Sequence, residues 1–94
     1  MLKLVWRDSA RNDVHDILGF IAERNEFTAN NLQSKILGCV EHLTDHPYIY
    51  RTGRVPGTRE AVVHPNYVLV YRVGADTVEI VSVMHTRRQY PPGE

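Results

Sequence analysis

The chain has 94 residues, a formal net charge of zero, 43% apolar and 23% charged side chains. This composition is typical of a globular protein and excludes a largely disordered chain, and the length predicts one domain spanning residues 1–94. The single cysteine, Cys39, excludes an internal disulfide framework and favours a reducing cytoplasm. The short, charged N-terminus does not resemble a signal peptide, and no apolar run approaches the roughly 20 residues that span a bilayer. We therefore expect a cytoplasmic protein that does not contact membranes.

Charge is divided unevenly between the two halves of the chain. Residues 1–45 carry five basic and seven acidic side chains, whereas residues 46–94 carry six arginines, no lysine and four acidic side chains. The halves therefore differ in net charge, −2 against +2. The planar guanidinium of arginine matches phosphate and stacks on bases, so the second half is the better place to seek an anionic partner. The alternative explanation is that the genome simply prefers arginine as its basic residue, which accounts for the same counts.

The first half predicts one strand and two helices. Apolar and other side chains alternate over residues 2–7, which indicates a strand. Asp8 or Ser9 is predicted to cap a first helix that ends near residues 24–25. A second helix is predicted from near Thr28 to residues 45–47. Each helix has an apolar stripe at helical spacing, formed by Val14, Ile17, Leu18 and Ile21 in the first and by Ala29, Leu32, Ile36, Val40 and Leu43 in the second. Because the connection is short, the helices should form an antiparallel hairpin on an apolar face.

The second half changes from a helical to a strand period. Residues 48–56 are predicted to be irregular, and strands are predicted at 58–64, 67–73 and 77–85, separated by turns at 65–66 and 74–76. Residues 86–94 form a basic tail that contains proline. The order β-α-α-β-β-β predicts an α+β fold: an antiparallel twisted sheet, with the first strand added to a meander and the helix hairpin packed on one face.

Three stretches of the chain resemble the RelE/ParE superfamily of toxins from type II toxin–antitoxin systems. They are residues 6–14, which open the first helix, residues 53–60 around a Pro-Gly turn, and residues 67–91. The last stretch holds the most characteristic elements, Tyr71-Arg72-Val73, Val78-Glu79-Ile80 and His85-Thr86-Arg87. The resemblance covers nearly the whole chain and implies a RelE/ParE-like fold and a cognate antitoxin that wraps the toxin in a hetero-oligomer.

The resemblance leaves the target open. Residues 56–60 and 88–91 look most like the RelE/StbE branch, which implies a ribosome-dependent mRNA interferase, an endoribonuclease that cleaves RNA without metal or cofactor. The ParE branch shares the Tyr-Arg-Val and His-x-Arg elements and implies a protein that poisons DNA gyrase without hydrolysis. A third hypothesis is a non-toxic family member that survives as a protein-binding module.

RNA cleavage of this kind needs cations around the phosphate and groups that accept and donate protons. By resemblance we place Arg59 as a phosphate clamp, Arg87 or Arg88 as a transition-state cation, and His85 or Tyr90 as acid or base. Further RNA- or phosphate-binding positions are Arg51, Arg54 and Arg72. Several RelE-like enzymes have lysines where this chain has Tyr50, Arg51 and Arg54, and an arginine cannot act as a base.

These residues also have structural explanations. Arg59 could pair with Glu60 or Glu79, Arg72 could form an ion pair inside its strand, and His85 and Tyr90 could simply pack the strand end and the tail. In a meander, alternate strands are parallel, so Arg59 at the start of one and His85 at the end of another need not be adjacent.

The remaining histidines and the cysteine predict no separate site. His42 and His46 have the i, i+4 spacing of a helical metal pair, but no third ligand has a fitting spacing, so we expect no metal. Cys39 lies among apolar positions and is predicted to be a small core residue.

Overall fold

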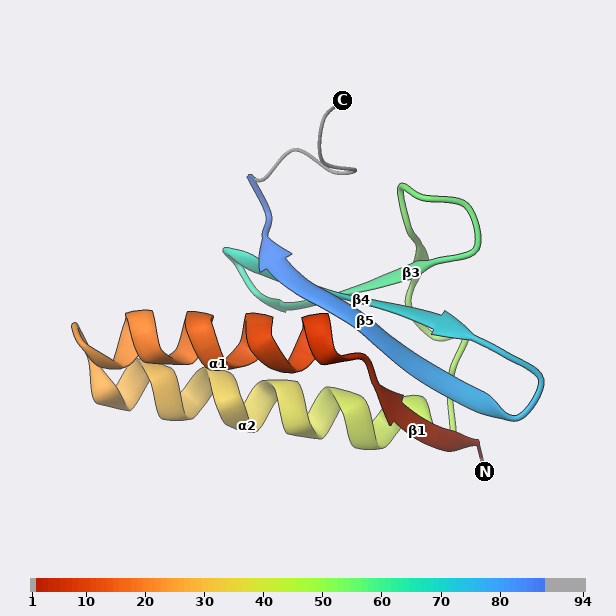
Figure 1. Cartoon of the computed structure of the whole chain (residues 1–94), viewed down its shortest axis with the longest axis horizontal. Coiled ribbons are helices and arrows are strands. Elements are labelled where there is room, and N and C mark those ends of the chain that lie inside the picture. Colours follow the sequence, from red (N-terminus) through yellow and green to blue (C-terminus); the bar gives the residue numbers. More distant parts are fainter. Residues whose placement is uncertain (1, 88–94) are drawn as a thin grey trace.

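Two helices lie side by side on one face of a five-stranded sheet in the computed structural model, which describes residues 2–87 (Figure 1). The elements are β1 (Lys3–Trp6), α1 (Asp8–Ala22), α2 (Glu26–Leu43), β2 (Arg51–Thr52), β3 (Arg59–His64), β4 (Tyr67–Val73) and β5 (Thr77–His85). The predicted α+β fold with its helix hairpin is confirmed, and a two-residue strand, β2, is added in the segment predicted to be irregular.

The sheet has the order β1-β5-β4-β3-β2, and its pairing is mixed. Strands β2 to β5 pair antiparallel, as the predicted meander requires. β1 pairs parallel with β5, with Leu4 opposite Val78 and Trp6 opposite Ile80. The helix hairpin makes this possible because it returns the chain to the far edge of the sheet before the meander begins. The strictly antiparallel description of the sheet therefore holds for four strands and not for β1.

The helix starts differ from the predicted caps. Arg7, rather than Asp8 or Ser9, occupies the N-cap position of α1, and its side chain forms an ion pair with Glu79 at 3.0 Å. The Ser9 hydroxyl instead donates to the carbonyl of Val81, at 2.9 Å. α2 begins at Glu26, two residues before the predicted Thr28, because Asn25 caps it by accepting a hydrogen bond from the Thr28 amide.

The main core lies between the hairpin and the sheet. All five residues of the predicted α2 stripe are buried: Ala29, Leu32, Ile36, Val40 and Leu43. They face the sheet side chains Tyr67, Leu69, Tyr71, Val78, Ile80 and Val83. α1 is less enclosed, since Ala10 is its buried residue and its predicted stripe, Val14, Ile17, Leu18 and Ile21, is partly buried.

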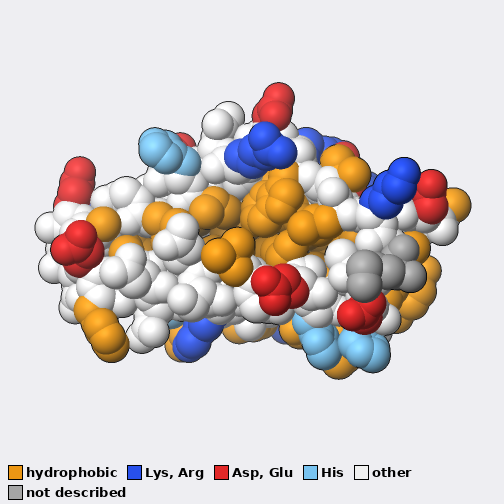
Figure 2. Space-filling model, turned by 90° about the horizontal axis from the view of Figure 1, so that it is seen from below, with side chains coloured by type: hydrophobic (Ala, Val, Ile, Leu, Met, Phe, Trp, Pro, Cys, Tyr) orange, Lys and Arg blue, Asp and Glu red, His pale blue; other side chains and the backbone are white. Residues whose placement is uncertain are grey.

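The helix side of the molecule leaves apolar surface uncovered. Figure 2 shows hydrophobic side chains gathered in the middle of this face. Trp6, Val14, Leu18 and Leu37 line a groove there of about 520 Å³. Of the helices in residues 2–87, neither has the length and apolarity required to traverse a bilayer.

Candidate functional site

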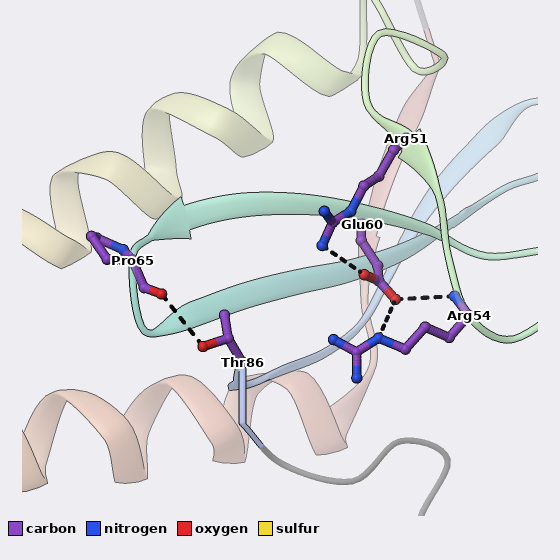
Figure 3. Close-up of polar contacts among 5 residues, drawn as sticks. All are labelled: Arg51, Arg54, Glu60, Pro65 and Thr86. Atoms are coloured by element: carbon purple, nitrogen blue, oxygen red, sulfur yellow. Dashed lines mark hydrogen bonds and ion pairs between the residues drawn. The ribbon is translucent and has the colours of Figure 1, made fainter.

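Two of the predicted phosphate-binding arginines, Arg51 and Arg54, contact one carboxylate on the sheet face opposite the helices. Arg51 Nη2 lies 3.1 Å from Glu60 Oε1 across the β2–β3 pair. The backbone N–H of Arg54 donates to Glu60 Oε2 at 3.1 Å, and its guanidinium Nε lies 3.7 Å from the same oxygen (Figure 3). Glu60 therefore joins a strand and the following turn to β3.

A third predicted arginine, Arg72, lies against the turn that the Pro-Gly pair predicts. Gly57 has a φ of 85°, in the left-handed region that favours glycine. A Cβ at Gly57 would lie 3.0 Å from Arg72 Nη1, so the turn passes directly over the Arg72 side chain. The Gly53 amide donates to the Thr58 carbonyl at 2.7 Å and closes the base of this loop. The loop thus brings Arg54 and Arg72 to the same face as Arg51.

Arg59 lies on the other face of the sheet, away from these arginines. It pairs in register with Tyr71, whose ring belongs to the core beneath the helices. Its Nη1 donates to the Tyr50 carbonyl at 2.7 Å, and its guanidinium carbon lies 4.9 Å from the centre of the Tyr48 ring. Arg59 therefore fastens the segment that follows α2 to the sheet. The alternative partners Glu60 and Glu79 are occupied by Arg51 and Arg7 instead.

His85 closes β5 beside aromatic side chains. It lies opposite Tyr67, and the two ring centres are 5.4 Å apart in an edge-to-face arrangement. Its Nδ1 accepts a hydrogen bond from the backbone N–H of Arg87, at 3.1 Å. The chain then stays close to the β3–β4 turn, because the Thr86 hydroxyl donates to the Pro65 carbonyl at 3.4 Å (Figure 3).

The predicted clamp and the predicted base are separated by the register of the sheet. Arg59 pairs with Tyr71 and His85 pairs with Tyr67, so four positions of β4 separate them along the strand direction. At usual strand dimensions this is about 13 Å along the sheet and about 10 Å across it. The expectation that the two residues need not be adjacent is confirmed. Arg87 is exposed, while Arg88 and Tyr90 lie outside the described residues. Their catalytic roles stay predictions.

Cys39, His42 and His64 border a separate hollow. It has a volume of about 530 Å³ and lies between α2 and β3, with Cys39, His42, Tyr50 and His64 among its lining residues. Burial raises the pKa of the Cys39 thiol, with a smaller opposing effect from its hydrogen bond to Tyr50. The thiol is therefore a weak nucleophile. Across residues 2–87, no group of three or more His, Cys, Asp or Glu side chains is arranged to hold a metal ion.

Sequence reasoning missed Glu60 as the centre of the arginine group. The available signal was that Glu60 is the single acidic residue among Arg51, Arg54 and Arg59 in residues 51–60. Strand alternation could have placed Glu60 and Arg59 on opposite faces. The pairing with Arg51 depends on β2, which no periodicity in residues 48–56 indicates.

Comparison with known families identifies the chain. A family model described as "ParE toxin of type II toxin-antitoxin system, parDE" matches residues 4–90. The chain belongs to the ParE toxin family. The resemblance to the RelE/ParE superfamily is thereby confirmed, with the matching model on the ParE side.

Known relatives share a toxin description or a similar fold. A curated protein of Sinorhizobium fredii (strain NBRC 101917 / NGR234), named "Putative toxin Y4kP", is 31% identical over 90 residues, covering 95% of this ParE-family chain and 93% of the relative. A toxin chain from the chromosomal ParDE system of P. aeruginosa has a similar fold, with a TM-score of 0.77 at 20% identity over 90% of this chain and 96% of that one. The YoeB/ParE toxin from Agrobacterium tumefaciens gives 0.65 at 17% identity, over 89% and 98%. At these identities the two solved structures support the ParE fold alone.

Proposed function

We propose that this ParE-family toxin acts by binding and poisoning DNA gyrase and catalyses no hydrolysis. The observation that carries the proposal is the separation of Arg59 from His85 by four positions of β4 and by the width of that strand. Cleavage of RNA needs a phosphate clamp and a proton acceptor within hydrogen-bond reach of one substrate. Among the described residues, the arginines around Glu60 and the histidine at the end of β5 do not share such a centre.

Charge supports the same proposal. The chain has a formal net charge of zero, so it lacks the broad electrostatic attraction that draws a protein to RNA phosphates. A toxin that recognises a protein surface does not need such an excess. The family match to ParE toxins points in the same direction.

One observation favours the alternative, a ribosome-dependent mRNA interferase. Arg51, Arg54 and Arg72 gather on a single face, as cations around a phosphate would. The alternative is therefore included as an outcome of the test below.

The partner that we propose is a cognate antitoxin. The family is described as the toxin of a type II toxin–antitoxin system. A toxin with a related fold, E. coli YafQ, is known in complex with DinJ, with a TM-score of 0.55 at 17% identity over 89% of this chain and 91% of that one. We propose that this chain likewise forms a hetero-oligomer, in which the antitoxin suppresses its toxicity.

Expression without the antitoxin tests the target. We expect filamentous cells, DNA damage and intact messenger RNA, and we expect the purified toxin to inhibit supercoiling by gyrase in vitro. Co-expression with the antitoxin encoded beside the gene is the control and should restore growth. The double variant H85A/R87A should remain toxic, because the proposed action needs no proton transfer by His85 and no cation at a reacting phosphate. Rapid translation arrest with messenger RNA cut at codon-defined positions, abolished in that double variant, would establish the interferase instead.

A further inference from the structure

Glu60 is a buried charge held between two exposed ones. The residue is 3% exposed, whereas the side chains of Arg51 and Arg54 are 59% and 42% exposed. A buried carboxylate is costly unless it is paired and hydrogen-bonded, and Glu60 meets this condition by accepting from both arginines. Buried ion pairs contribute little to stability compared with an apolar replacement, and their better-supported role is to fix one arrangement.

The arrangement that Glu60 fixes is the position of two guanidinium groups. Its two oxygens are divided between them: Oε1 contacts Arg51 from β2, and Oε2 contacts Arg54 from the following turn (Figure 3). An arginine carries several N–H donors in a planar fork. The Arg51 side chain donates one hydrogen bond to Glu60 and is 59% exposed, so a partner can reach it. Because the side chain is already held, binding through it costs less conformational entropy.

We propose that Glu60 is a positioning residue, and that the arginine pair Arg51 and Arg54 that it holds is a docking site for a carboxylate on the toxin's protein target. This inference rests on the proposed function, since it names the chemistry by which the toxin recognises gyrase. The guanidinium fork matches a carboxylate in a bidentate geometry that a single point charge does not provide.

Local charge favours a protein carboxylate over nucleic acid. Arg51, Arg54 and Glu60 sum to a formal charge of +1, and the whole chain is neutral. Binding along a phosphate backbone relies on many neutralised phosphates, which this small group does not offer. One acidic side chain is a sufficient counterpart for the pair.

Four variants test the inference against purified gyrase. E60Q removes the charge that holds the arginines, R51Q removes one fork, and R51Q/E60Q combines the two changes. E79Q is the matched control, because it removes a partly exposed carboxylate that pairs with Arg7 at the β1–β5 edge of the sheet. The measurements are the Kd for gyrase, the Kd for a short DNA duplex and the thermal midpoint of each variant.

We expect E60Q and R51Q each to weaken gyrase binding roughly tenfold, as the loss of one charge-assisted hydrogen bond does. The double variant should bind no more weakly than the weaker single variant, because Glu60 acts through Arg51. A purely structural role for Glu60 would not produce this coupling. E79Q should bind like wild type. R51Q keeps the inference testable even if E60Q does not fold, since Arg51 is exposed.

Each contrary result has a distinct meaning. If wild type neither binds nor inhibits gyrase, the proposed function fails and the inference fails with it. If wild type binds gyrase and both E60Q and R51Q bind it as tightly as wild type does, the inference alone is overturned. If the loss of gyrase affinity in R51Q/E60Q equals the product of the two single losses, Glu60 does not act by positioning Arg51. A loss of duplex binding with unchanged gyrase binding would assign the pair to nucleic acid and overturn the carboxylate partner.

Discussion

Replacing Tyr71 with phenylalanine should destabilise the protein at pH 8, and this loss should disappear or reverse at pH 11. The Tyr71 side chain is fully buried, and its hydroxyl donates to the Pro47 carbonyl at 2.7 Å. This bond connects the segment that follows α2 to the sheet. At pH 8, Y71F should lose about 1 kcal/mol of unfolding free energy, the usual net value of such a bond. For a domain of this size that corresponds to a fall in Tm of roughly 4–8 °C.

The alkaline effect follows from the ionisation of the phenol. Burial raises the pKa of Tyr71 to about 12, and the nearby charge of Arg59 opposes this rise to a smaller extent. An unfolded tyrosine ionises near pH ~10. The stability contributed by the neutral buried phenol is therefore complete below about pH 10 and is lost as the pH rises from there through about 12. In this window each pH unit lowers the unfolding free energy of wild type by at most about 1.4 kcal/mol. This loss matches or exceeds the contribution of the hydrogen bond itself.

Urea unfolding of the two proteins at pH 8 and pH 11, followed by far-ultraviolet circular dichroism, measures both effects. Wild type should be the more stable protein at pH 8, and Y71F should equal or surpass it at pH 11. Y48F is the control, because Tyr48 is 65% exposed and its ring, which Arg59 contacts, is retained. A difference between wild type and Y71F that stays constant from pH 8 to pH 11 would refute the assignment of a buried, neutral phenol.

Three further predictions follow from burial and hydrogen bonding. L32A should lower the unfolding free energy by about 2–5 kcal/mol because Leu32 is 1% exposed in the core, whereas L37A on the same helix, where Leu37 is 52% exposed, should cost well under half as much in parallel urea titrations. Iodoacetamide should modify Cys39 at pH 8 at least about tenfold more slowly in the folded protein than in urea, since burial raises the thiol pKa; equal rates would contradict that cause. D13A should lose about 1–2 kcal/mol because Asp13 Oδ2 accepts from the Val83 amide at 3.1 Å, and hydrogen exchange at Val83 should accelerate.

Periodicity and turn chemistry in the sequence determined the elements themselves. The α2 stripe is buried as its spacing predicts, because residues three and four apart share one helix face. Strands β4 and β5 occupy the predicted ranges 67–73 and 77–85, because their β-branched and aromatic residues are bounded by turn residues. Motif resemblance added the superfamily, which the family match confirms.

Helix capping shows where local rules stop. Ser9 and Asp13 are polar residues in the first turns of α1, where local rules predict hydrogen bonds to the free backbone N–H groups of the helix. They bond to the backbone of β5 instead, to the Val81 carbonyl and the Val83 amide. Their partners lie about 70 residues away in the sequence, so no local pattern could have named them.

The candidate site depended on the tertiary structure even more. The sequence identified the arginines, and it supplied the argument that Arg59 and His85 need not meet. Only the sheet register placed Arg59 on the helix side and Glu60 on the opposite face, where it holds Arg51 and Arg54. Likewise, the parallel pairing of β1 with β5 depends on how the helix hairpin packs on the sheet. The physical reason is that period and turn residues act over a few neighbours, whereas strand partners and buried charges are selected by which distant surfaces exclude water together.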